Sequence, residues 1–305
     1  MTMLSIIIPV YNGANYIQNC YNSIKENLSF VDKEIIFVNN GSTDNSLELL
    51  NEIEDKSVHI ITTDTKGVSN ARNIGINHAK GKWLFFMDVD DTIAFVDRNF
   101  LNVLHEDFDI VWIIYNKVQG NNNFHSYNSL IKEGLYDILE FSKIWHGEGM
   151  VWPFMFRRSL VKNLFFTEMS FFEDSDFLYH YLANVTNVYL SHNMIYSYFI
   201  RADSTMQAAK LEKKYVDAVT GLVRNQELLM SISHFYKKVL GPHIVKNYLW
   251  VIRRAPSPIF KKINHLIKER NLSQSLLYGN LKQIFMASVC MFSINLFRYI
   301  FRFKV

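Results

Sequence analysis

The first hundred residues alternate short apolar runs with longer polar segments, and this pattern limits the possible folds more than any other feature of the chain. The runs are rich in β-branched and aromatic residues, as buried strands are; they are Leu4–Pro9, Glu34–Val38, Val58–Ile61 and Trp83–Met87. The segments between them are long enough for helices that begin near Gly13, Asp44 and Gly67. Strands that alternate with helices predict βαβ units, and therefore an α/β fold with a mixed, mostly parallel sheet flanked by helices.

Beyond Asp97 the alternation loosens, and the last third is almost entirely helical in pattern. Further strands are expected at Asp109–Tyr115, at Val188–Leu190 and at Ile195–Ile200, and a helix at Phe172–Ala183. From Met206 onward only helices are expected, with breaks at Gly241-Pro242 and at Pro256–Pro258. We therefore expect an α/β domain over residues 1–205 and a helical extension over residues 206–305.

The charges divide at the same boundary. Residues 1–205 carry 15 basic and 25 acidic side chains, whereas residues 206–305 carry 17 and 4, so the formal charge of +3 averages two unlike parts. The chain is 49% hydrophobic with only 5 Pro, which provides for a large core and excludes a disordered polymer.

Several sequence features exclude particular compartments and cofactors. Cys20 and Cys290 are too few for a disulfide framework and fit a reducing compartment. The Met1–Tyr11 segment lacks a basic lead and contains Pro9, so no cleavable signal peptide is expected. A phosphate-binding GxxxxGK[ST] loop and a His/Cys zinc cluster are both missing from the sequence.

Polar residues follow each of the first four predicted strands. Parallel strands bring these residues to one edge of the sheet, where ligands of such folds bind. They comprise Pro9-Val-Tyr11-Asn12, Asn39-Asn40-Gly-Ser-Thr-Asp44, the Lys66–Gly75 segment with Arg72, and Asp88-Val-Asp90-Asp91. Amides suit a base edge, an arginine suits phosphate, and carboxylates suit Mg²⁺ or Mn²⁺, so the set favours a nucleotide with a divalent cation.

Simpler interpretations exist for parts of this set. The Asn40–Asp44 turn is also an ordinary capping sequence, in which Ser42 or Asp44 caps the second helix and Ser69 the third. The Asp88–Asp91 cluster is harder to explain without a ligand, because three carboxylates at a buried sheet end repel each other unless positive charge compensates them.

A second acidic cluster lies in Phe171–Phe177. Its sequence is FFEDSDF, at the start of a predicted helix. Acidic residues at a helix N-terminus are favourable in themselves. Alternatively, a carboxylate among aromatic rings has a raised proton affinity and suits a general base that deprotonates a hydroxyl.

Taken together, these residues resemble glycosyltransferase family 2, the inverting nucleotide-sugar transferases with the GT-A fold. The resemblance covers about two thirds of the chain and rests on several motifs in the family's order. They are Ser5–Asn12, the Asn40–Asp44 turn, Gly67–Gly75 and Asp88–Asp91, followed more weakly by Val151-Trp152, Phe156–Ser159, Glu173-Asp174 and Tyr196–Ser204.

The resemblance implies a nucleotide-sugar donor held at the sheet edge. Pro9, Tyr11, Asn12 and Asn40 would hold the base, with Tyr11 against its face. Arg72 would help to hold the nucleotide, and Asp88 would lie near the ribose and the metal. Asp90 would ligate the Mn²⁺ or Mg²⁺ ion, while Arg201 and Ser204 would lie on a loop over the diphosphate.

It also implies a catalytic and acceptor side. Asp174 matches the general base, so that an acceptor hydroxyl attacks the anomeric carbon in one inverting displacement and forms a β-glycoside. Glu173 and Asp91 would contact the acceptor, and Asp91 would alternatively support the metal. Trp152 would stack under an acceptor sugar, or would be an ordinary core residue.

One position departs from the family pattern. Many relatives have Asp-Asp where this chain has Asn39-Asn40. An amide oxygen still accepts the N3–H of uracil, although more weakly than a carboxylate does. A UDP-hexose or UDP-N-acetylhexosamine is the expected donor.

The basic extension predicts where in the cell the protein lies and which kind of acceptor it uses. The uncharged Gln283–Phe297 segment is too short to span a bilayer and is followed by basic and aromatic residues, as in an interfacial helix on anionic lipid. A helical subdomain with a solvated basic face is the simpler alternative. We expect a protein on the cytoplasmic face of the membrane that acts on a polyprenyl-diphosphate-linked saccharide in the synthesis of surface polysaccharide such as O-antigen or capsule.

Two other functions fit the same residues less well. One is a nucleotidyltransferase or another metal-dependent nucleotide-binding α/β enzyme, and the other is a non-catalytic membrane-bound partner, for which Asn40 is the only sign. Nucleic-acid binding is not expected because the basic extension lacks a recognisable motif. The oligomeric state is left open.

Overall fold

The computed structural model describes residues 2–169, 171–201 and 211–254. The chain divides into two compact units, each made of separate stretches of sequence. The first contains residues 1–138, 150–169 and 184–208, and the second contains residues 139–149, 170–183 and 209–305. The expected division at 205/206 therefore differs in two insertions, 139–149 and 170–183, which belong with the C-terminal helices.

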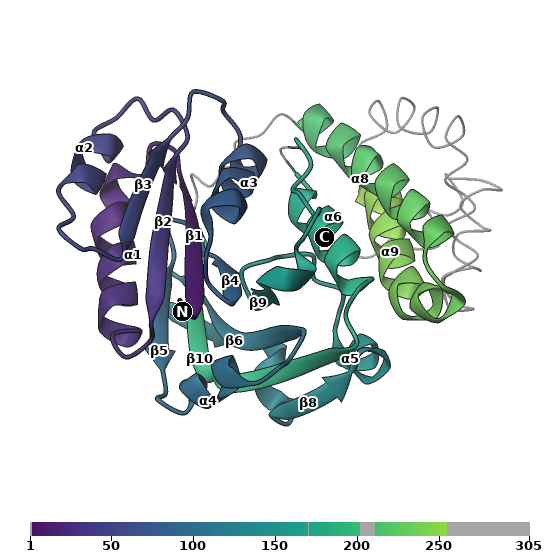
Figure 1. Cartoon of the computed structure of the whole chain (residues 1–305). Coiled ribbons are helices and arrows are strands. Elements are labelled where there is room, and N and C mark those ends of the chain that lie inside the picture. The colour runs from purple at the N-terminus through teal and green to yellow at the C-terminus, as the bar shows by residue number, and fades with distance from the viewer. Residues whose placement is uncertain (1, 170, 202–210, 255–305) are drawn as a thin grey trace. The chain divides into compact units, whose positions relative to one another are not determined.

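The first unit is built on a ten-stranded mixed sheet (Figure 1). Its main path runs in the order β3-β2-β1-β4-β9-β6-β10-β5, and β7 and β8 pair with β6 and β10. The strands are β1 (Leu4–Val10), β2 (Lys33–Asn39), β3 (Val58–Thr62), β4 (Trp83–Phe86), β5 (Thr92–Val96), β6 (Ile110–Gln119), β7 (Asn122–His125), β8 (Gly134–Asp137), β9 (Phe154–Arg157) and β10 (Asn187–Phe199). β3, β2, β1 and β4 are parallel to one another, so their carboxyl ends meet at one edge.

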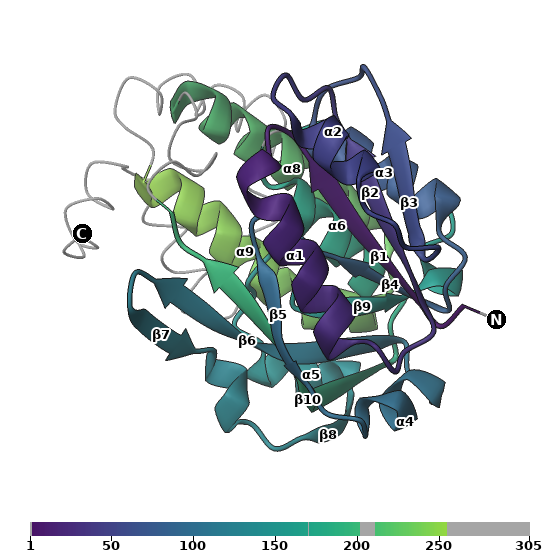
Figure 2. The same ribbon diagram turned by 90° about the vertical axis from the view of Figure 1, so that its left-hand side faces the viewer.

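Both faces of β1, β2 and β4 are buried, whereas β3 at the edge of the sheet is partly exposed. Figure 2 shows α1 (Ala14–Asn27) lying along one side of these strands. Ile17 and Ile24 of α1 share a core with Ile6 of β1. On the opposite face α3 (Val68–His78) approaches β1 so closely that a Cβ on Gly75 would lie 2.3 Å from Ile7. The near-continuous apolar runs of the sequence follow from this double coverage.

The remaining helices of the first unit are short. They are α2 (Ser46–Asn51), α4 (Phe100–His105) and the single 3₁₀ turns Tyr127–Leu130 and Arg158–Leu160. Every strand expected from the sequence is present, and β10 joins two of them through a register shift between Ser191 and Ile195. Strands β5, β7, β8 and β9 are not evident from the sequence pattern. All four pair in antiparallel fashion.

The described part of the second unit is mainly helical. Its helices are α5 (Ile138–Ile144), α6 (Glu173–Leu182), α8 (Leu211–Ser231) and α9 (His234–Arg254). Asp176 of α6, 1% exposed, pairs with Arg224 of α8 at 2.9 Å. Asn247 of α9 donates a hydrogen bond to the Tyr179 hydroxyl of α6 at 3.0 Å, so two polar contacts link α6 to the long helices.

The predicted break at Gly241-Pro242 is wrong, because α9 continues through Pro242. A proline inside a helix removes one backbone hydrogen bond. Buried side chains precede and follow it, including Leu240 and Ile244, and their packing outweighs that loss. The helices instead separate at residues 232–233.

Several expectations lie outside the described residues, namely Ser204, the break at Pro256–Pro258, Cys290 and the Gln283–Phe297 segment. Cys20 is buried in the core of the first unit. Among the helices of the described ranges, none combines the length and hydropathy that a membrane span requires.

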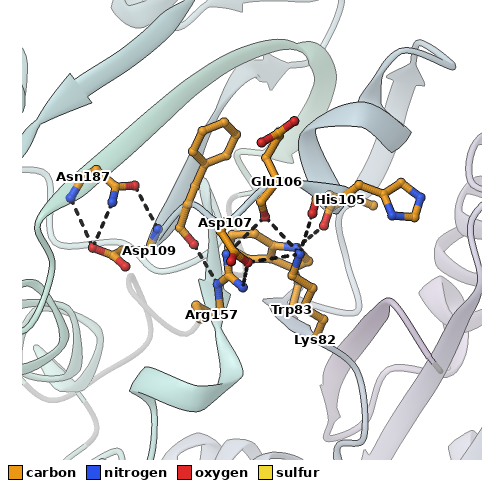
Figure 3. A network of polar contacts seen from close by, with 10 residues as sticks. Lys82, Trp83, His105, Glu106, Asp107, Asp109, Arg157 and Asn187 are labelled. Atoms are coloured by element: carbon orange, nitrogen blue, oxygen red, sulfur yellow. Dashed lines mark hydrogen bonds and ion pairs between the residues drawn. The ribbon is translucent and has the colours of Figure 1, made fainter.

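A network of cationic side chains holds the end of α4 (Figure 3). Arg157 donates to the carbonyls of Phe108 (2.7 Å) and Glu106 (3.1 Å) and pairs with Asp107 at 2.8 Å. Lys82 donates to the carbonyls of His105 and Glu106. These bonds satisfy carbonyls at the negative end of the helix, where cations are favourable.

We expect Arg157→Ala to lower the free energy of unfolding by about 2 kcal/mol, because it removes charged donors from carbonyls that are held in place. Urea unfolding of the full chain measures this. The matched control is Asp107→Ala, which removes the ion pairs of that carboxylate with Arg157 and Lys82 and leaves the bonds to the carbonyls. The carboxylate is 91% exposed, so its loss should leave the urea midpoint nearly unchanged. Equal effects of the two substitutions would contradict this account.

His243 of α9 is a partly buried histidine that remains neutral near pH 7. Its Nε2 lies 3.0 Å from the carbonyl oxygen of Ser142, and burial lowers its pKa to about 4. A Cβ on Gly147 would lie 2.8 Å from its Nδ1, so the ring is tightly enclosed.

Since the pKa of His243 falls on folding, its contribution to stability is complete above pH 6.5 and is lost as the pH falls toward 4. We expect the free energy of unfolding to drop by up to about 3 kcal/mol over that range from this group. His243→Gln should flatten this part of the pH profile in chemical denaturation. A profile with the same slope in both proteins would show that other groups cause it.

Candidate nucleotide-binding site

The turn after β2 fixes the start of α1. Two side chains of the turn and one of the first residue of α2 accept hydrogen bonds from successive backbone N–H groups at the beginning of α1: Ser42 from Asn12 (3.0 Å), Ser46 from Gly13 (2.9 Å) and Asp44 from Ala14 (3.2 Å). The Asn40–Asp44 segment therefore serves chiefly α1. Asp44 also accepts from the N–H of Ser46 in α2 (3.1 Å), but the N-cap of α2 is Asn45, so neither Ser42 nor Asp44 is the predicted cap of this helix.

Asn12 is part of the same arrangement. It has a φ of 50°, in the left-handed region, and its side-chain oxygen accepts from the N–H of Thr43 at 2.8 Å. Because this amide oxygen already holds the turn, Asn12 shapes the site through its backbone.

Two residues beside the turn have the properties of a base-binding pair. Tyr11 is 51% exposed, although it is a large aromatic residue. Asn40 is 4% exposed, and its Oδ1 has no hydrogen-bond partner within the described part of the chain. Lys66 lies over the Tyr11 ring at 5.9 Å, and Pro9 precedes them at the end of β1. A buried acceptor without a donor is costly, so this position suits a ligand N–H.

Arg72 is held inside the first unit by α3. It is 4% exposed, its Nη2 pairs with Asp88 at 3.1 Å, and its guanidinium lies 5.2 Å from the Phe166 ring. Arg72 is therefore a buried partner of Asp88, and not a surface helix residue.

The predicted capping role of Ser69 is wrong, because its hydroxyl donates to the Thr167 carbonyl at 2.7 Å.

Asp90 pairs with Arg201 at the end of β10. Arg201 Nη1 lies 2.5 Å from Asp90 Oδ2, and its Nη2 donates to the Asp90 backbone carbonyl. The guanidinium also lies 4.0 Å from the centre of the Tyr16 ring on α1. The Asp90 side chain is 35% exposed, so solvent and ligands reach it.

Asp91 has a structural role, which corrects the expectation that it contacts the acceptor. It is 1% exposed, accepts a 2.6 Å hydrogen bond from the Tyr196 hydroxyl and accepts another from the Phe199 N–H. Burial, together with the neighbouring Asp88 and Asp90 carboxylates, raises its pKa well above the usual range. Asp91 thus ties β10 to the end of β4.

Trp152 is a core residue, the simpler of the two expectations for it. It is 4% exposed and stacks on Tyr196 and Tyr198 with centroid distances of 5.0 and 5.1 Å. Tyr115 meets it edge-on at 4.7 Å. Its ring surface is therefore used within the protein, and little of it is left for an acceptor sugar.

The carboxylates after β4 fit a divalent cation that is shared with a ligand. Asp88 and Asp90 are hard oxygen donors with side chains 36% and 35% exposed, and each already faces a guanidinium. Across the described ranges, no group of three or more His, Cys, Asp or Glu is placed to hold a metal unaided. Magnesium-like ions often use one or two carboxylates plus substrate phosphates, which matches this arrangement.

Glu173 and Asp174 lie in the first turn of α6, in the second unit. Phe172 precedes them with a φ of 66°, an unusual conformation for an aromatic residue. The third acid of the cluster, Asp176, is the buried partner of Arg224 and serves the packing of the second unit. The catalytic role of Asp174 stays a prediction.

Sequence reasoning missed Tyr16 and the individual role of Tyr196. Tyr196 stands in a segment that resembles the family, but nothing in the sequence shows that its hydroxyl meets Asp91. Tyr16 lies on a predicted helix without any motif, and only the fold brings it to Arg201.

The comparisons with known proteins agree with this architecture. The glycosyltransferase GlyG of Streptococcus pneumoniae is 26% identical over 222 residues, 67% of this chain and 73% of that protein. The glycosyltransferase GlyA of the same organism is 29% identical over 217 residues, 66% of this chain, which spans only 31% of the length of GlyA. The poly(ribitol-phosphate) beta-glucosyltransferase of Bacillus spizizenii is 30% identical over 66% of this chain and 32% of its own length.

A solved structure and a family model complete the comparison. The crystal structure of S. aureus TarS 1–349 in complex with UDP-GlcNAc has a TM-score of 0.66 at 18% identity, over 90% of this chain and 89% of that one, and this likeness confirms the predicted GT-A fold. The model of the family described as Glycosyl transferase family 2 matches residues 5–165. Since this match covers more than half of the 305 residues, the chain belongs to glycosyl transferase family 2.

Proposed function

We propose that the protein transfers a sugar from a uridine-diphosphate sugar to a hydroxyl of a saccharide acceptor, in bacterial polysaccharide synthesis. The observation that carries this proposal is the exposed Tyr11 ring together with the buried, unpartnered Asn40 oxygen, next to the paired carboxylates after β4. Family membership supports the reaction class, and relatives such as the poly(ribitol-phosphate) beta-glucosyltransferase support a bacterial surface polymer as its product.

The base-binding side follows from hydrogen-bond chemistry. Asn40 Oδ1 accepts the uracil N3–H, which supplies the donor that this buried oxygen lacks. The Tyr11 ring packs against the base, and the N-terminus of α1 is fixed by the adjacent turn. The name of the TarS complex supports a UDP-sugar of this kind as the donor.

The diphosphate side uses the charges after β4. Asp90, with Asp88, would hold a Mn²⁺ or Mg²⁺ ion, and Arg72 keeps Asp88 in place by a buried ion pair. When bound, the ion supplies positive charge that offsets the diphosphate. Arg201 adds a second positive charge for the leaving group.

The transfer itself is a single displacement. Asp174 takes the proton of the acceptor hydroxyl, whose oxygen forms a bond to the anomeric carbon. The bond from that carbon to the diphosphate oxygen breaks, and its electron pair leaves with UDP. One displacement inverts the anomeric centre, so an α-linked donor gives a β-glycoside.

We also propose a lipid-linked acceptor and a position on the inner face of the cell membrane. The support is the basic, aromatic composition of residues 255–305, which resembles an interfacial segment. A saccharide on a polyprenyl diphosphate would bring a second anionic group to such a surface.

The reaction class is tested with a panel of UDP-sugars, a synthetic sugar-diphosphate-lipid acceptor and product analysis by mass spectrometry, with and without Mn²⁺. We expect the acceptor to gain one hexose or N-acetylhexosamine and UDP to be released. Release of pyrophosphate would instead identify a nucleotidyltransferase, and the absence of any product would contradict transfer to such acceptors.

Asp174→Asn should lower the turnover at least 1,000-fold, about the upper range of general-base effects, and leave the Kd for UDP within about twofold. The matched control is Glu212→Gln, an exposed acid on α8 in the same unit, which should retain normal turnover. Turnover assays and calorimetric UDP titrations measure the two quantities. Near-normal turnover in Asp174→Asn would contradict the assignment of Asp174 as the general base.

A further inference from the structure

Arg201 occupies the position of a cation at Asp90. Its guanidinium contacts both the side chain and the backbone carbonyl of Asp90, and these contacts place positive charge where the proposed function requires a metal ion. The ion pair is partly exposed, since the Arg201 side chain is 22% exposed and that of Asp90 is 35% exposed, and solvent access weakens a pair of this kind. The pair is therefore stable enough to form and weak enough to be exchanged.

Tyr16 adds a platform for the arginine in this position. The Arg201 guanidinium lies 4.0 Å from the Tyr16 ring centre and 5.5 Å from that of Phe199, both within the range of cation–π attraction. Phe199 is itself fixed, because its N–H donates to the buried Asp91 at 2.9 Å. The two contacts with Asp90 and the two ring contacts thus favour the arginine at Asp90 when no ligand is present.

The two neighbouring carboxylates, Asp88 and Asp91, differ from Asp90 because their partners are more deeply buried. Asp88 faces Arg72, which is 4% exposed and held by α3, and Asp91 is bonded to the buried Tyr196 hydroxyl. Those partners are enclosed by the core, so they stay in place when a ligand binds. Arg201 is the partner that has room to leave.

We propose that Arg201 is an exchangeable counter-ion of Asp90, and that Tyr16 is the residue that holds it there. This inference rests on the proposed function, because the exchange needs a divalent ion and a diphosphate. Without nucleotide, Arg201 competes with the ion for Asp90. A bound diphosphate attracts the guanidinium away, so that ion and nucleotide bind with positive coupling.

The test measures Mn²⁺ binding to the full chain from the electron paramagnetic resonance signal of free Mn²⁺, with and without saturating UDP. We compare the wild type with Arg201→Met, Arg201→Lys and Tyr16→Leu. The matched control is Arg98→Met, an exposed arginine of the same unit whose guanidinium lies 5.4 Å from the Phe30 ring. Circular dichroism checks that each variant is folded.

Without UDP, Arg201→Met should bind Mn²⁺ about tenfold more tightly than the wild type, the equivalent of one good ion pair. Tyr16→Leu should bind it roughly two- to fivefold more tightly, the value of an exposed cation–π contact. Arg201→Lys should lie near the wild type because it keeps the charge, and so should Arg98→Met. With UDP, the wild-type affinity should rise and that of Arg201→Met should gain much less.

Two results would overturn the proposal, and they are distinguishable. If UDP strengthens Mn²⁺ binding equally in the wild type and in Arg201→Met, the exchange is refuted while the metal role of the proposed function stands. If no variant binds Mn²⁺ with or without UDP, the metal role itself fails, and the exchange fails with it.

Discussion

Three carboxylates within four residues, at the end of the buried strand β4, set the central constraint on this protein. Each receives a different partner: Arg72 from α3 for Asp88, Arg201 from the end of β10 for Asp90, and the Tyr196 hydroxyl for Asp91. Like charges this close destabilise a fold unless they are compensated, so α3 and β10 are bound to β4 by electrostatics as well as by packing. The positions of these partners around the candidate site follow from the need to compensate the three carboxylates.

This arrangement changes the argument for a metal ion. The acidic cluster alone suggested that a cation is required, whereas the folded chain supplies guanidinium groups and a hydroxyl of its own. A divalent ion would therefore replace a protein group and would not fill an uncompensated site. Its presence would then depend on the diphosphate that accompanies it, because Asp88 and Asp90 provide only part of a coordination shell.

The parallel half of the sheet was predictable from the sequence because buried parallel strands are apolar on both faces. The short antiparallel strands β5 and β7–β9 were not, since β7 for example is exposed along its length and has no apolar alternation. Pro242 misled the prediction of α9 because packing against neighbouring helices overrides a local preference. The turn after β2 was recognised as a capping sequence, but the sequence favoured the helix that follows it, whereas Ser42 and Asp44 accept bonds from the start of α1.

The site was predictable in its residue types and less so in their roles. The positions of Tyr11, Asn40, Asp88 and Asp90 at the strand ends, and of Arg72 on the helix after β3, follow from the topology alone. Burial separates the roles: Asp91 and Trp152 stand in motifs that suggest ligand contact, yet both are enclosed by tyrosines of β10. Tertiary contacts between residues far apart in the sequence decide this, 105 residues apart for Asp91 and Tyr196, and no local pattern encodes them.

The most direct measurement is a pair of crystal structures of the full chain, one without ligand and one with UDP and Mn²⁺. We expect the uracil N3–H to donate to Asn40 Oδ1 and Arg72 to remain on Asp88 in the complex, with Arg201 released from Asp90. A base bound away from Tyr11 and Asn40, or a metal bound at Asp90 with Arg201 unmoved, would contradict the account.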